Sequence, residues 1–111
     1  MEMALIEIAK DFSPAPAGRY RADGSYSGEA FREDYLKKAL DKDYLVEVVL
    51  DGAFGYGSSF LDEAFGGLVR LGYFSYEDLS KRLTITAHSQ TFSHYKRLIE
   101  KYISEAKPKS N

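Results

Sequence analysis

The sequence of 111 residues contains no cysteine. This absence excludes disulfides, thiolate metal sites and cysteine nucleophiles together. Because disulfides are typical of secreted proteins, we expect this chain to be cytoplasmic. No apolar run approaches the ~18 residues that a membrane-spanning helix needs, and an acid interrupts the short apolar stretch at the N-terminus. We therefore expect no membrane span and no signal peptide.

The chain also lacks an excess of positive charge. It carries 15 lysines and arginines against 17 aspartates and glutamates, a formal net charge of −2. Proteins that bind a nucleic-acid backbone carry clustered positive charge, so we expect no nucleic-acid partner. The composition, 44% hydrophobic and 29% charged, is typical of globular proteins. The length predicts one domain over residues 1–107, followed by a polar tail at 108–111.

Three segments have the apolar or alternating pattern of β-strands, and they lie at residues 3–8, 45–50 and 83–87. The middle segment is almost continuously apolar, which predicts a strand covered on both faces. The segment 12–21 has two interpretations, a loop or an additional edge strand.

Apolar residues at helical spacing follow each predicted strand. We expect helices to begin at Ser25 or Ser27, at Ser58 or Ser59, at Ser75 for a short helical turn, and near Thr91. Within the second helix, Gly66 and Gly67 indicate close packing against a neighbouring backbone. The alternation of strands and helices predicts an α/β fold, in which helices pack against a small mixed or mostly parallel sheet.

The segment Asp51–Glu63 combines the end of a strand, a glycine-rich turn and a serine pair that opens a helix. Ligands of open α/β sheets bind at the carboxyl ends of strands, and the first amides of a helix attract anions. The segment lacks the lysine of a phosphate-binding loop and the spacing of a dinucleotide motif. Two interpretations remain: a functional surface, or a tight turn in which Ser58 or Ser59 caps the helix.

Arginines are concentrated in a second segment, Gly18–Gly24, with Arg32 on the helix that follows. Arg19 and Arg32, together with the turn at Asp23, could form a site for a phosphate or carboxylate, because guanidinium groups bind both through two parallel hydrogen bonds. The alternative is structural: Asp23 holds the turn, and the arginines pair with nearby acids.

The two histidines, His88 and His94, have a spacing that fits neither one helical turn nor a known zinc site. A triad of Ser59, His88 and Asp51 lacks the glycine-flanked turn on which such a serine usually sits. We therefore expect no catalytic residues, no metal and no cofactor.

Aromatic residues are numerous, with nine tyrosines and seven phenylalanines. Five of them lie in or beside predicted turns: Tyr26, Tyr56, Tyr73, Phe74 and Tyr76. These rings could form an interface, including that of a homodimer, or they could cover the edges of the core.

Two groups of residues resemble the pattern of a prokaryotic family of small STAS-like proteins of unknown function. The first group is Gly18-Arg19-Tyr20, Asp23-Gly24, Ser27-Gly28 and Phe31-Arg32. The second group is Leu50-Asp51-Gly52 and the run from Tyr56 to Leu68. The resemblance extends from about Met3 to Ala87 and implies a STAS-like α/β fold.

The family name points to the anti-sigma factor antagonists. In those proteins a partner ATPase of the histidine-kinase-like type phosphorylates a serine where a strand opens into a helix. Ser58 and Ser59 occupy the similar place, although Gly57 replaces an acid and Phe60 replaces a glycine of that motif. The resemblance implies a protein partner and a regulatory serine.

Our leading hypothesis is a non-enzymatic, regulatory protein-interaction module. Its surface would comprise Tyr56, Gly57, Ser58, Ser59, Asp62 and Glu63. The alternative is a phosphate- or nucleotide-binding protein or enzyme that uses Arg19, Arg32 and the start of the helix near Ser58.

Overall fold

The computed structural model describes residues 3–109. Strands β1 (Met3–Glu7), β2 (Leu45–Val49) and β3 (Leu83–Thr86) form one sheet in the order β1-β2-β3. Both strand pairs are parallel, and Val48 of β2 lies opposite Ile6 and Ile85. The predicted α/β fold and the three predicted strands are confirmed. The described part of segment 12–21 contains no strand, because the chain forms the helical turn η1 (Ile8–Phe12) and then a loop.

Helices form the connections between the strands. A first continuous helix comprises α1 (Gly28–Phe31), η3 (Arg32–Leu36) and α2 (Lys37–Lys42), and a second comprises α3 (Ser58–Leu61), η4 (Asp62–Gly66) and α4 (Gly67–Arg70). Two further helices, α5 (Tyr76–Arg82) and α6 (Gln90–Glu105), flank β3. A short helical turn, η2 (Arg21–Asp23), precedes α1.

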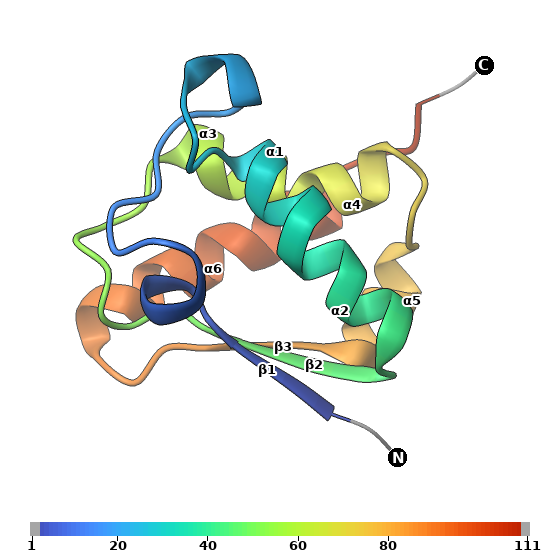
Figure 1. The fold of residues 1–111 in the computed structure, drawn as a ribbon. Coiled ribbons are helices and arrows are strands. Elements are labelled where there is room, and N and C mark those ends of the chain that lie inside the picture. Colours follow the sequence, from blue (N-terminus) through green and yellow to red (C-terminus); the bar gives the residue numbers. More distant parts are fainter. Residues whose placement is uncertain (1–2, 110–111) are drawn as a thin grey trace.

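The helices lie on one face of the sheet (Figure 1). Parallel strands are connected by right-handed crossovers, and here each crossover moves to the next strand in the same direction. Successive crossovers of the same hand and direction place their helices on the same side. The chain never reverses direction across the sheet, so the helices that connect the strands lie on the same face, and α6, which follows β3, lies on that face as well (Figure 1).

The uncovered face corrects the expectation that the strand at 45–50 is covered on both sides. Residues of β2 alternate between buried and half-buried, with Val46 and Val48 directed to the helices. On the opposite face of the neighbouring strand, Leu5 is 56% exposed. The apolar run in the sequence therefore does not distinguish a strand covered on both faces from one with an open apolar face.

The core lies between the sheet and the helices. Phe31, Phe60 and Phe65 are fully buried, and the ring of Phe31 lies 6.1 Å from each of the other two rings. Burying a side chain of this size stabilises a fold by roughly 1.5–3 kcal/mol. These rings join the first two helices over the sheet and so hold the start of α3 in place.

Three of the four longer helices begin at a capping serine. The hydroxyl oxygens of Ser27, Ser75 and Ser89 accept hydrogen bonds from backbone N–H groups in the first turn of α1, α5 and α6. The helix at α3 instead begins after Gly57, and neither Ser58 nor Ser59 caps it. The prediction of a serine cap was wrong here, because both serines are already inside the helix.

Candidate functional site

The candidate site lies at the carboxyl end of β2, the central strand, where residues 51–57 lead into α3. Gly52 and Gly55 have φ angles of +98° and +156°, a conformation that side-chain-bearing residues rarely adopt. Gly57 is extended and forms the helix cap. The turn therefore depends on its glycines, and it places Ser58 and Ser59 on the surface at the first two positions of the helix.

Asp51 fixes the base of this turn. Its carboxylate accepts hydrogen bonds from the backbone N–H groups of His88 (2.8 Å) and Ser89 (3.0 Å). Burial by itself would raise the pKa of Asp51, but these hydrogen bonds outweigh it and lower the pKa below its ordinary value. Asp51 thus links the end of β2 to the start of α6.

Tyr56, which the sequence suggested as a contact residue, is 7% exposed. Its hydroxyl donates a 2.6 Å hydrogen bond to the carbonyl of Leu50, and its ring packs against Phe60 and Tyr95. Burial, and to a smaller extent the charge of Asp51, raises the pKa of the phenol well above its usual value. Tyr56 holds the turn from inside and offers little surface to a partner.

Phe54 is the residue of this turn that the sequence analysis did not single out. The residue is 87% exposed, although its backbone N–H donates a 2.8 Å hydrogen bond to the carbonyl of Pro14. Phe54 is the most exposed of the large hydrophobic residues in the described part of the chain, and aromatic residues are enriched at protein interfaces. The sequence does contain a local indication of this residue, because an aromatic residue lies between Gly52 and Gly55 in a predicted turn. The geometry of the turn then directs its side chain outward.

Behind the serines, acids and arginines form an ionic network. Arg19 contacts Asp62 at 2.8 Å and Glu63 at 3.3 Å, while Arg70 contacts Asp62 at 3.2 Å. The guanidinium of Arg32, which is 3% exposed, donates to the Glu63 carboxylate and to the Glu63 carbonyl, each at 2.7 Å. It also pairs with Glu33 at 2.8 Å.

The charges of this network balance. Arg19, Arg32 and Arg70 face Asp62, Glu63 and Glu33, three cations against three anions. Burial would raise the pKa of Asp62, but the hydrogen bonds from Arg19 and Arg70 lower it below its ordinary value. The hydrogen bond to Asp62 in turn raises the pKa of Arg19. The two arginines suggested as an anion site are therefore already paired with carboxylates of this chain.

Gly66 and Gly67 lack side chains, and this leaves space for the side chains of Asp62 and Arg32. A Cβ atom at Gly67 would overlap the guanidinium of Arg32, and one at Gly66 would lie 2.8 Å from the Asp62 carboxylate. The sequence predicted a neighbouring backbone at these glycines. The backbone carbonyl of Tyr102 does lie 3.4 Å from the Gly66 position, but at Gly67 the neighbour is the Arg32 side chain.

Asp23 lies apart from this network and shapes a turn. Its carboxylate accepts hydrogen bonds from the backbone N–H groups of Arg19 (3.2 Å) and Tyr20 (2.9 Å). This contact holds Arg19 near α3, so that its guanidinium reaches Asp62.

Of the six residues that the sequence suggested as an interaction surface, Gly57, Ser58 and Ser59 are exposed and Asp62 is partly exposed. Tyr56 and Glu63 are buried. Across residues 3–109, no cluster of three or more His, Asp or Glu side chains has the geometry of a metal site. No helix in the described part of the chain has the length and apolarity to cross a membrane.

Comparison with known proteins gives one match. The family model described as a STAS-like domain of unknown function matches residues 27–91. The match includes α1 with its cap Ser27, strands β2 and β3, and the whole turn that leads into α3. Neither the curated proteins nor the solved structures gave a match.

Proposed function

Because the chain belongs to the family of STAS-like domains of unknown function, we propose that it acts as a non-enzymatic protein-interaction module. Its contact surface would be the β2–α3 surface, which we define as Phe54, Gly57, Ser58, Ser59 and Asp62. The partner we propose is an ATP-binding regulatory protein of the histidine-kinase-like type, by analogy with the anti-sigma factor antagonists. Tyr56 and Glu63 support this surface from inside.

One observation carries the proposal: an 87% exposed phenylalanine precedes two exposed serines on a turn that is rigidly held. Exposed aromatic side chains cost free energy in water and supply much of the binding energy of protein interfaces. The turn is fixed by Asp51, by the Tyr56 hydroxyl and by the backbone hydrogen bond from Phe54 to Pro14. A preformed surface of this kind loses little conformational entropy when a partner binds.

The ionic network supports control by phosphorylation at Ser58 or Ser59. A phosphoserine adds about two negative charges, which are favoured at a helix start but repelled by nearby acids. Asp62 lies in the next turn of the helix, and its charge is compensated by Arg19 and Arg70. The acids therefore oppose the modification less than the sequence alone suggests.

In this scheme the partner is the kinase that catalyses the phosphoryl transfer. The serine oxygen would form a bond to the γ-phosphorus of ATP, the bond to the ADP oxygen would break, and a base of the partner would take the hydroxyl proton. The added charge beside Phe54 would then weaken the apolar contact with the partner.

The proposal is tested by capture from an extract of the source cell, with intact mass recorded. We expect Phe54→Ala to weaken partner binding by about tenfold or more, as truncation of an aromatic anchor does. Wild-type chain should gain the mass of one phosphate, and the Ser58→Ala/Ser59→Ala variant should not.

Two control variants truncate an exposed aromatic residue and an exposed serine at other places in the chain. Tyr44→Ala removes a 48% exposed ring just before β2, at the opposite end of the strand, and Ser25→Ala removes an exposed hydroxyl. Both should bind and become modified like the wild type. If Phe54→Ala and Ser58→Asp/Ser59→Asp both leave partner binding unchanged, the proposed surface is wrong.

A further inference from the structure

The guanidinium of Arg19 is paired through only one of its nitrogens. Its Nη1 atom donates to the carboxylates of Asp62 (2.8 Å) and Glu63 (3.3 Å). Within residues 3–109, neither its Nε nor its Nη2 atom donates to a protein oxygen, and the side chain is 31% exposed. A guanidinium binds a phosphate through two parallel N–H donors, and the Nε–Nη2 edge supplies such a pair. Arg19 therefore presents an anion-binding edge that the ionic network does not use.

Both acids that Arg19 contacts also have another arginine. Asp62 is paired with Arg70 at 3.2 Å, and Glu63 is paired with the buried guanidinium of Arg32 at 2.7 Å. A buried or half-buried charge is destabilising when it loses its last partner. Because each acid retains a partner, Arg19 can turn toward a new anion without leaving either carboxylate unpaired.

Ser59 lies on the helix face that Arg19 contacts. Side chains three and four positions apart on a helix are neighbours, with Cβ atoms about 5–6 Å apart. Ser59 precedes Asp62 by three positions and Glu63 by four, whereas Ser58 has this relation to Asp62 only. The backbone N–H of Asp62 contacts the carbonyls of both serines, so the helical turn between them is formed. A phosphate on Ser59 would therefore lie beside the guanidinium of Arg19.

Of the partly exposed arginines of the network, Arg19 is the one within reach of Ser59. Arg70 lies on the same helix, about 16 Å further along its axis than Ser59. The backbone of Arg19 is fixed, because its N–H donates to the Asp23 carboxylate (3.2 Å) and its carbonyl accepts from the N–H of Glu29 (3.0 Å). Only the side chain has to move in order to meet a phosphate.

We propose that Arg19 is the internal receptor for a phosphate on Ser59. This inference rests on the proposed function, which places a regulatory phosphate on Ser58 or Ser59, and it selects Ser59. The phosphate oxygens would accept two parallel hydrogen bonds from the Nε and Nη2 atoms of Arg19, while the acids keep their other arginines. The modification would thereby tie the loop 18–24 to the start of α3, next to the β2–α3 surface.

The test installs the phosphate without a kinase. The full chain is produced with phosphoserine at position 59, 58 or 104 by genetic-code expansion. A pH titration followed by phosphorus NMR then gives the pKa of the second phosphate ionisation, which is ordinarily about 6. A paired arginine lowers this pKa because it favours the dianion, and nearby acids raise it in every variant alike.

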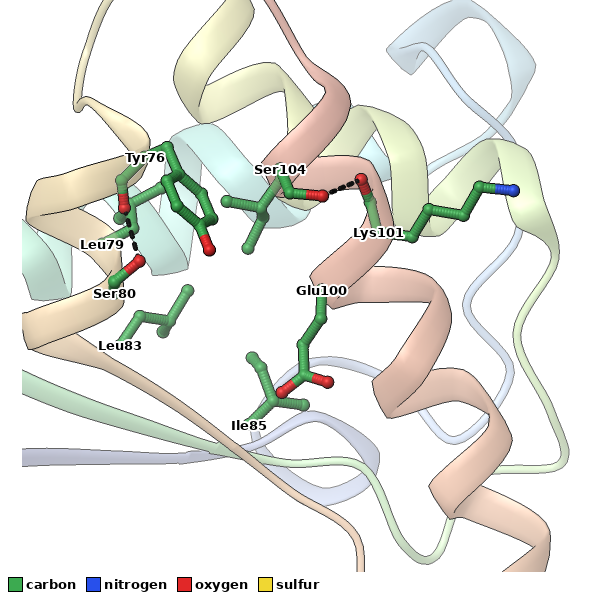
Figure 2. A pocket seen from close by; sticks show the side chains of 9 residues that line it. Tyr76, Leu79, Ser80, Leu83, Ile85, Glu100, Lys101 and Ser104 are labelled. Carbon is green, nitrogen blue, oxygen red and sulfur yellow. Dashed lines mark hydrogen bonds between the residues drawn. The ribbon is translucent and has the colours of Figure 1, made fainter.

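Ser104 is the remote control position. It is exposed on α6, and Figure 2 shows its hydroxyl bonded to the carbonyl of Lys101 beside the depression between α5 and α6. None of the residues that line this depression belongs to the ionic network around Arg19. Ser58 is the near control, because it shares the helix start with Ser59 but not the face that contacts both acids.

We expect Arg19→Gln to raise the pKa of the phosphate on Ser59 by about one unit or more, and to leave that on Ser104 unchanged. The matched variant Arg21→Gln should change neither, because Arg21 belongs to the same loop but contacts Asp34. Arg19→Lys keeps the charge without the paired donors, so it should give an intermediate value. This variant also keeps the test decisive if Arg19→Gln does not fold.

The inference is overturned if Arg19→Gln changes the pKa of the phosphate on Ser59 no more than Arg21→Gln does. It is also overturned if the phosphate on Ser58 responds to Arg19→Gln as strongly as that on Ser59. The proposed function fails separately: capture from the extract would then yield neither a partner nor a gain of phosphate mass, whatever the installed phosphate shows. A captured partner with no response of the phosphate to the Arg19 variants would overturn this inference alone.

Discussion

At the scale of single residues, Arg32 shows how burial changes the role of a charge. Its side chain is 3% exposed and donates hydrogen bonds to Glu33, to the Glu63 carboxylate and to the Glu63 carbonyl. Burying two opposite charges is tolerable when each is paired, but removing one leaves the other unpaired at high cost. Glu63 is 7% exposed, so it has little access to water as a substitute partner.

We predict that Arg32→Ala lowers the free energy of unfolding by about 3–5 kcal/mol, the usual cost of breaking a buried pair. Urea denaturation at neutral pH measures it. The control is Arg21→Ala, which removes a surface arginine paired with Asp34. Water screens that pair, so Arg21→Ala should lower the free energy of unfolding much less than Arg32→Ala does. Equal losses for the two variants would show that the Arg32 network contributes no more than a surface pair.

Asp51 is a second residue whose contacts join distant elements. Its carboxylate holds the backbone N–H groups of His88 and Ser89 and so ties β2 to the start of α6. The folded state lowers the pKa of Asp51. A carboxyl group with a lowered pKa stabilises the fold above its ordinary pKa, and this contribution disappears as the pH falls through the lowered value.

We therefore predict that Asp51→Asn is less stable than the wild type at neutral pH, because an amide cannot accept both hydrogen bonds as a carboxylate does. The difference should begin to shrink as the pH falls below about 4, the ordinary pKa at which the carboxyl of the unfolded chain becomes protonated. It should disappear as the pH falls through the lowered pKa of the folded state. Urea denaturation at a series of pH values tests this prediction. A difference that is constant from pH 7 to about 3 would contradict the role of the charge.

At the scale of elements, the crossing of the first two helices depends on Gly28. A Cβ atom at this position would lie 2.5 Å from the carbonyl oxygen of Phe60 and 3.1 Å from the backbone nitrogen of Ala64. Backbone atoms cannot move aside as side chains do. The two helices therefore approach closely at this point, and the approach brings Arg32 of η3 to Glu63 of η4.

We predict that Gly28→Ala destabilises the fold by about 1–3 kcal/mol or more, the cost of overpacking. The matched control is Gly57→Ala, where nothing lies within 4 Å of the new Cβ and φ is −75°. At that cap position, alanine should cost only about 0.5 kcal/mol. Thermal or urea unfolding compares the two variants, and equal effects would argue against a close helix crossing at Gly28.

At the scale of the whole molecule, the helices cover one face of the sheet and leave the other uncovered within the described residues (Figure 1). Neighbouring residues of β1 report on the two faces. Ile6 lies 7% exposed under the helices, and Leu5 is 56% exposed on the other side. The same truncation at adjacent positions therefore separates the two environments.

We predict that Ile6→Ala lowers the free energy of unfolding by about 2–5 kcal/mol, because it opens a cavity in the core. Leu5→Ala should cost less than about 1 kcal/mol, since its side chain is largely in water already. Urea denaturation of the two variants measures both changes in the free energy of unfolding. A comparable loss at Leu5 would mean that another chain covers the open face in solution.

Much of the fold followed from local patterns in the sequence. The three strands, the helices between them and the helix start at Ser75 were predicted, and Ser27 was one of the two positions predicted for the first helix. Periodicity and capping depend on residues a few positions apart, which is why the sequence reveals them. The paired serines were also correctly placed at a helix start. Their own capping role was not, because Gly57 takes the cap position one residue earlier.

The sequence by itself thus determined the order of the strands and main helices, the α/β class with a mixed or mostly parallel sheet, and the family resemblance, all of which depend on short-range patterns and on motif residues. Tertiary structure alone decided which charges meet and which faces stay open. Arg19 pairs with an acid 43 residues away, and Tyr56 turns inward while Phe54 turns outward. These outcomes depend on how the crossovers place distant segments against each other, and no local pattern encodes that placement.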